Sequence, residues 1–156
     1  MTSCIFSAAA QELLTDAETN NISLINVYEQ IRPAAFPAFV NKLIFAAFFR
    51  RELTDPESEE YDLIVVLDQI ELLKTKVETK YAKNAHRCRV IVRVAGLPIQ
   101  KTGVLKISLW QNKSELVTEV RIDVLDLTVA PEILLSQGGG ESAISTAPTN
   151  PKIENL

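Results

Sequence analysis

Glycine and histidine are scarce in this chain of 156 residues, and their scarcity excludes several kinds of active site. Only Gly96 and Gly103 precede the three consecutive glycines at 138–140. Phosphate-binding loops need clustered glycines so that backbone amides can approach the anion, which excludes a P-loop or a dinucleotide-binding fold. With a single histidine, His86, there is no His-rich metal site and no imidazole relay. The GxSxG, HExxH, EF-hand and zinc-site spacings are missing too, so the sequence predicts a non-enzyme with no catalytic residue, cofactor or metal ligand.

Cysteine is also rare, since Cys4 and Cys88 are the only two and they do not form a CxxC motif. Two separated thiols in a reducing compartment are more often small core residues than a disulfide. No signal peptide is predicted, because no basic residue precedes Arg32 and the apolar stretch between Ser3 and Ala10 is too short. We therefore expect a cytoplasmic protein.

Long apolar runs are limited to one stretch, 36-FPAFVNKLIFAAFF-49, and it is too short to cross a membrane. A spanning helix needs about 20 apolar residues, whereas Lys42 and Arg50 bracket only seven. Pro33 and Pro37 also stop a regular helix or central strand before it. After Lys42, both faces of an extended chain are apolar, which is typical of a strand buried on both faces. The core residues predicted here are Phe45, Phe48 and Phe49.

What the chain does contain is alternation of apolar and polar residues, the pattern of a half-buried β-strand. The clearest example is 87-RCRVIVRV-94, in which Cys88 and the valines share one face and the arginines the other. Segments 104–110 and 116–124 alternate in the same way and are joined by a turn-like link, which predicts a hairpin. Further strands are predicted at 3–14, at 22–31 and from Asn41 to Arg51.

Segment 61–81 fits two structures. Leu63, Leu67 and Ile70 would share one face of a helix, and Glu, Leu and Lys are good helix formers. However, 74-KTKVETKY-81 alternates without error, and 61-YDLIVVL-67 is typical of a buried strand, so two strands are favoured over one helix. With about eight strands and no helix, the sequence predicts an all-β fold. The expected architecture is an antiparallel β-sandwich, immunoglobulin-like or C2-like, with a barrel as the second choice.

Residues 1–136 are expected to form this sandwich as one domain, with 137–156 as a flexible C-terminal tail. The tail, QGGGESAISTAPTNPKIENL, begins with a run of glycines and contains little that could be buried. Its end, 151-PKIENL-156, fits a short docking peptide or, as the favoured alternative, a plain disordered end.

The run 23-SLINVYEQI-31, followed by 36-FPA-38 and 43-LIFAAFFR-50, resembles a family of small uncharacterised bacterial domains. Members carry an "sLiGvY" strand, then "FPa", then an apolar strand. The segment 96-GLPIQKTGVLKISLWQN-112 and the strand after it are similar to the close of that domain, so the resemblance covers about residues 3–126. Asn26 stands where members often have a glycine that permits a turn or bulge. The resemblance implies a sandwich fold and no assigned activity, so it assigns no functional residues.

Charge is distributed unevenly along the chain. Residues 1–73 have a net charge of −8, from four basic and twelve acidic side chains. Residues 74–114 have a net charge of +9, from ten basic and one acidic, and residues 115–156 have −5, from two basic and seven acidic. The whole chain is therefore acidic, at −4, but its segment 74–114 is strongly basic.

The alternation in this basic segment predicts a candidate interaction face. Its members are the outward residues of two predicted strands: Lys74, Lys76, Lys80, Arg87, Arg89 and Arg93. If the two strands pair, six cations form one surface for an acidic protein, a nucleic acid or an anionic lipid surface. Alternatively, acidic neighbours compensate the cations, and the lysines protect a sheet edge. Aromatic residues, which usually accompany the cations of nucleic-acid grooves, are few here, so nucleic acid is the less favoured partner.

The leading hypothesis is a non-catalytic protein that binds a partner protein or itself, as an accessory subunit of a bacterial or phage assembly. The second is a binder of nucleic acid or another anionic surface through the basic sheet face at 74–93. A small-molecule binder or an enzyme with a pocket between the sheets is the least favoured, since no substrate site is evident. Membrane insertion is not expected.

Overall fold

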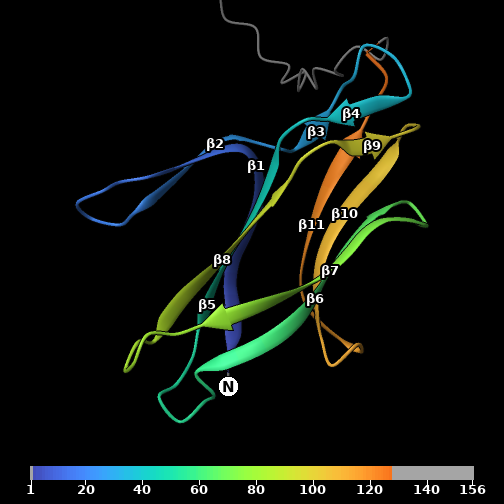
Figure 1. Cartoon of the computed structure of the whole chain (residues 1–156). Coiled ribbons are helices and arrows are strands. Elements are labelled where there is room, and N and C mark those ends of the chain that lie inside the picture. The colour runs from blue at the N-terminus through green and yellow to red at the C-terminus, as the bar shows by residue number, and fades with distance from the viewer. Residues whose placement is uncertain (1, 128–156) are drawn as a thin grey trace, which may run out of the picture.

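The computed structural model describes residues 2–127, which form two β-sheets packed as a sandwich (Figure 1). The predicted tail 137–156 and the end of the predicted domain lie outside the described residues. The described part of the chain contains no helix with the length and apolar character needed to cross a membrane.

Sheet A has the strand order β2-β1-β5-β8, and every pair in it is antiparallel. Its strands are β1 (Ser3–Thr15), β2 (Ile22–Val27), β5 (Leu43–Arg50) and β8 (Arg87–Val94). Sheet B has the order β3-β11-β10-β6-β7 and is antiparallel except for the β3–β11 pair. Its strands are β3 (Gln30–Ile31), β6 (Ser58–Leu67), β7 (Ile70–Lys80), β10 (Gly103–Gln111) and β11 (Glu115–Val124). A separate two-stranded sheet joins β4 (Ala38–Val40) to β9 (Leu97–Ile99).

The sandwich prediction is confirmed, and each of the predicted strands overlaps a different one of the eight strands of six or more residues. Segment 61–81 forms β6 and β7 rather than a helix. The two strands turn at Asp68, whose φ of 54° is left-handed. Its carboxylate accepts a hydrogen bond from the Val104 N–H at 2.9 Å, which ties the turn to β10.

The single strand predicted at 22–31 is wrong, because the chain changes sheets within it. β2 belongs to sheet A and β3 to sheet B. Between them, the Tyr28 N–H still donates to the Ala9 carbonyl of sheet A, at 2.8 Å. One residue later, the Glu29 carbonyl already accepts a hydrogen bond from the Asp123 N–H of sheet B, at 3.1 Å.

Asn26 has a φ of 53°, just before this change of sheet. This is the left-handed region that glycine adopts without strain and that asparagine tolerates better than most residues. Its side-chain amide donates to Gln11 Oε1 at 3.0 Å, on the paired strand. The backbone conformation that a glycine would permit at this position is therefore present.

The core lies between the two sheets, and β5 is buried on both of its faces, as predicted. Phe45 and Phe49 point inward and are fully buried, and the Phe49 ring stacks on Tyr61 with 5.2 Å between centroids. Ala46, on the opposite face of β5, is fully buried as well. Phe48 shares this outer face but is only partly buried, so it is not an interior residue. Sheet B contributes Leu63, Leu67, Leu105, Ile107, Leu109 and Ile122 to the core.

A buried arginine, Arg51, holds the end of the sandwich where the chain crosses between the sheets. Its Nε donates to the Ala85 carbonyl at 3.1 Å, and its Nη1 donates to the Asp55 carbonyl at 2.8 Å. The guanidinium carbon lies 4.7 Å from the centroid of the Tyr81 ring, a cation–π arrangement. These contacts fix the crossover from β7 to β8.

Cys4 and Cys88 are free thiols, and both are partly buried. Each lies opposite Phe49 on a different neighbouring strand, so their Cα atoms are roughly 10 Å apart. A disulfide needs Cα atoms within about 7 Å. Burial raises the pKa of the Cys88 thiol, which disfavours its reactive thiolate form.

Candidate interaction surface

The six cations of the predicted interaction face do not share one surface. The lysines lie on β7 in sheet B and the arginines on β8 in sheet A. Because the outward faces of a sandwich point in opposite directions, the two groups are separated. The condition for one shared surface, that these two strands pair, is not met: β7 pairs with β6, and the chain then crosses to the other sheet, where β8 pairs with β5.

Two of the lysines on β7 have carboxylates close by. Lys76 Nζ is paired with Glu60 on β6, and Lys80 Nζ lies 3.0 Å from Glu78 Oε2. The hydrogen bond to Glu60 raises the pKa of Lys76 above its ordinary value. On sheet B, opposite charges therefore compensate these lysines, as is common between neighbouring strands.

The arginines on sheet A lack such carboxylates. Arg87 lies directly opposite Arg50 of β5, so two like charges meet at this end of the sheet. Arg50, Arg87 and Arg93 form no salt bridge with any residue that the structure describes. Arg89 donates from Nη1 and Nη2 to the backbone and side-chain oxygens of Asn20, at 2.7 and 2.6 Å. Since β5, β8 and the part of β1 paired with β5 contain no Asp or Glu, this face is positively charged.

A β-hairpin lies over part of this positive face. β1 pairs with β5 only up to Ala10 and then leaves the sheet, paired with β2 (Figure 1). We call residues 11–27 the arm. Its turn is shaped by the carboxylate of Asp16, which accepts hydrogen bonds from two backbone N–H groups at 2.9 and 2.7 Å. Because Arg89 holds Asn20, the tip of the arm is fastened to the outer face of sheet A.

An apolar groove of about 440 Å³, which we call the arm groove, lies between the arm and the sheet. Its lining residues are Ile5, Phe6, Ile22, Leu24, Val27 and Phe48. The rings of Phe6 and Phe48 pack with 5.7 Å between centroids, yet Phe6 remains 52% exposed. Ile5 and Val27 are also more than half exposed. Because Phe48 lies opposite Arg89 on β8, Arg89 is next to this groove, and the opposed pair of Arg50 and Arg87 follows two residues further along the strands.

Alternation does not predict the arm groove, because a β-bulge lies between Cys4 and Phe6. Strict alternation from the inward-facing Cys4 places Phe6 in the core. The bulge inserts Ile5 as an extra residue, so that Phe6 instead faces outward, opposite Phe48. The one signal in the sequence is the length of β1, since its 13 residues exceed the usual strand.

Two further hollows present polar and charged groups. A pocket of about 520 Å³ at the end of sheet A is lined by Ser3, Arg50, Arg51, Glu52, Leu53, Thr54 and His86. His86 Nδ1 lies 3.4 Å from the Arg51 carbonyl, and among the described residues no hydrogen bond joins it to a serine, threonine or cysteine side chain. Within residues 2–127, no group of three His, Cys, Asp or Glu residues lies together as metal ligands do. On sheet B, a smaller hollow places Lys74 beside Trp110.

No protein-family model matches the sequence, and no curated protein matches it. Among solved structures, the comparison finds that of an immunoglobulin-like protein from Pseudomonas aeruginosa. The similarity has a TM-score of 0.40 and 12% sequence identity, and it covers 80% of this chain and 97% of that one. The assignment of a sandwich rests on the strand pairing of the chain itself.

Proposed function

We propose that this protein is a non-catalytic binding subunit, and that a partner protein docks in the arm groove. The observation that carries this proposal is the exposure of Ile5, Phe6 and Val27, each more than half exposed within one groove. Neighbouring exposed apolar side chains often mark an interaction site. Covering each of them removes apolar surface from water and contributes on the order of 1 kcal/mol.

The charges beside the groove favour an acidic partner segment. Arg50 and Arg87 repel each other across the strands, and a carboxylate placed between them replaces repulsion with attraction. Guanidinium groups also bind carboxylates through two parallel hydrogen bonds. The partner that fits is therefore a protein segment with aromatic or aliphatic side chains next to Asp or Glu.

A nucleic acid or an anionic lipid surface is the second candidate, because the same arginines attract phosphates. The arm makes it less favourable. Residues 11–27 contain Glu12, Asp16 and Glu18 but no basic residue. A long polyanion that crosses the groove meets these carboxylates, whereas a short acidic segment bound along β8 does not.

A peptide-display selection on the full chain tests the proposal. The selected peptides are expected to combine apolar residues with Asp or Glu. Phe6→Ser is expected to weaken their binding about ten-fold or more, and Arg87→Glu about five-fold with loss of salt dependence. The matched control is Ile70→Ser, since Ile70 is 51% exposed on β7 of the other sheet, and its binding is expected to match that of the unaltered chain.

Two results would count against this function. If the selected peptides bind Phe6→Ser as tightly as the unaltered chain, the arm groove is not the docking site. If single-stranded DNA or RNA binds in a salt-dependent way and loses affinity in Arg87→Glu but not in Phe6→Ser, the second candidate replaces the first.

A further inference from the structure

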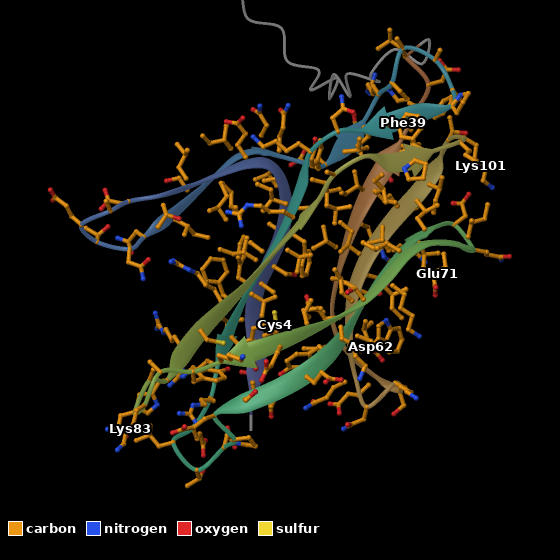
Figure 2. All side chains as sticks on the ribbon, viewed as in Figure 1. Cys4, Phe39, Asp62, Glu71, Lys83 and Lys101 are labelled. Carbon is orange, nitrogen blue, oxygen red and sulfur yellow. The ribbon has the colours of Figure 1, made fainter. Side chains whose placement is uncertain are left out.

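A second groove, distinct from the arm groove, lies at the end of the sandwich where β3, β4 and β9 gather (Figure 1). Its volume is about 300 Å³, and its apolar lining includes Tyr28, Ile31, Phe39, Val40 and Ile99. We call it the β4–β9 groove. Phe39 is 64% exposed, the highest value among the large apolar side chains of the described residues. It lies at the opposite end of the molecule from Lys83 (Figure 2).

The walls of this groove are fixed by hydrogen bonds. Val40 pairs with Leu97 across the β4–β9 sheet. The Tyr28 hydroxyl donates to the Lys42 carbonyl at 2.9 Å, and β3 pairs with the end of β11. The groove is therefore formed before any segment enters it, which lowers the entropic cost of binding.

The C-terminal part of the chain leaves the sandwich beside this groove. The Leu125 N–H donates to the carbonyl of Ile31, a lining residue, at 2.9 Å. The described residues end two positions later, at Leu127, which is 58% exposed. After Thr128, the sequence continues as 129-VAPEILL-135, with four large apolar residues in seven. The Gly- and Ser-rich sequence begins only after this segment.

We propose that residues 129–135 of the same chain dock in the β4–β9 groove. Leu134 is seven residues beyond Leu127, and an extended chain of that length spans up to about 23 Å, enough to reach any part of a groove that begins beside Ile31. Because the segment is tethered, its effective concentration at the groove is far above that of a second copy in dilute solution.

The charges agree with this occupant. Both charged residues that line the groove, Arg32 and Lys42, are basic. The single charged residue of the segment is Glu132, which is acidic. Lys42 also forms a salt bridge with Glu12 of the arm at 3.0 Å and is 57% exposed, so Glu132 would join an existing cluster of opposite charges.

Photo-crosslinking in the full chain tests the docking. A benzoylphenylalanine at position 134 is expected to crosslink within one chain to peptides that contain Phe39 or Ile99. Phe39→Ser is expected to reduce these crosslinks several-fold, and a probe at position 145, in the Gly- and Ser-rich part, should not produce them. Crosslinks to other parts of the sandwich would overturn the proposal. Crosslinks between two chains would overturn it in favour of a second copy.

A double-mutant cycle on thermal unfolding provides an independent readout. Phe39→Ser and Leu134→Ser are each expected to lower the Tm by about 2–4 °C, and the double variant should show little further loss, because both changes remove one contact. The shifts should not depend on protein concentration. Additive shifts would show that the two residues are not in contact. Since Phe39 is not in the arm groove, failure here would leave the proposed function untouched.

Discussion

The outer faces of the two sheets carry similar amounts of basic charge but differ in how that charge is balanced. On sheet B, Lys76 and Lys80 each have a carboxylate within reach. On sheet A, Arg50, Arg87 and Arg93 have none among the described residues, and the exposed apolar groove lies on the same side of this sheet. Basic charge alone therefore does not identify a binding face, whereas uncompensated charge beside exposed apolar surface supports one.

The difference originates in the neighbouring strands. β7 lies beside β6, whose outward-facing Glu60 and Asp62 supply two carboxylates, and β7 itself adds Glu78. β8 lies beside β5, 43-LIFAAFFR-50, which supplies none and adds one more arginine. β5 is apolar because its outer face is covered. A covered face has no place for carboxylates, and the apolar residues of this strand also form the apolar surface at the margin of sheet A.

One carboxylate introduced on each outer face should give the largest contrast. Ala46 on β5 is fully buried, so Ala46→Asp leaves a charge without water or a partner and is expected to lower the free energy of unfolding by about 3 kcal/mol or more. Ile64→Asp on β6 is the matched change, because Ile64 is partly exposed and opposite Lys74. Its expected cost is about 1 kcal/mol. Urea unfolding measures both, and equal costs would show that the two outer faces are equally open.

Removal of one cation from each face should have a smaller effect on stability than the introduced carboxylates. Arg89→Ala removes both hydrogen bonds that hold Asn20, so amide hydrogen exchange in the arm is expected to become about ten-fold faster. Lys76→Ala removes only an exposed ion pair with Glu60, and exchange in β6 and β7 should change by less than about two-fold. Unchanged exchange in the arm would mean that Arg89 does not fasten it.

Alternation predicts most of this fold because it is a local property. The outward residues of β7 and β8 are predicted by period two alone, and continuous apolar runs predict β5 and β6. β3, β4 and β9 have two or three residues each, too few to show a period. The break within 22–31 depends on a left-handed residue, Asn26, and on hydrogen bonds to two different sheets, none of which changes the pattern of apolar residues.

The candidate site was harder to predict because it depends on pairing between distant segments. Whether the lysines and arginines share a face is decided by β8 pairing with β5, some forty residues earlier in the chain, rather than with β7. The apolar part of the site depends on the bulge at Ile5, which reverses the direction of Phe6. Period two identifies which side chains share a face of one strand, but not which strand lies beside it.

The smallest expected effect is a difference between the two faces in how their local stability depends on pH. Hydrogen bonds from Thr19, through its backbone N–H and its hydroxyl, and from the Glu18 N–H hold the pKa of Asp16 below its ordinary value of 3.8. A carboxyl whose pKa is lowered by folding stabilises the folded form above its unfolded pKa, and this contribution is lost as the pH falls through the folded pKa. The turn of the arm should therefore loosen only at acidic pH, below about 4.

Lys76 on sheet B behaves in the opposite sense. The Glu60 carboxylate raises the pKa of Lys76 above 10.5, so the contribution of this ion pair to stability is complete below that pH and is lost only as the pH rises through the folded pKa.

An NMR titration from pH 2.5 to 7 measures the effect at Asp16. The Thr19 amide is expected to shift with a midpoint below 3.8. Asp16→Asn keeps an accepting oxygen without a titrating group, so it is expected to abolish that shift. A midpoint at or above 3.8 would show that the turn does not stabilise the carboxylate, and the arm would then be held over sheet A by Arg89 without help from its own turn.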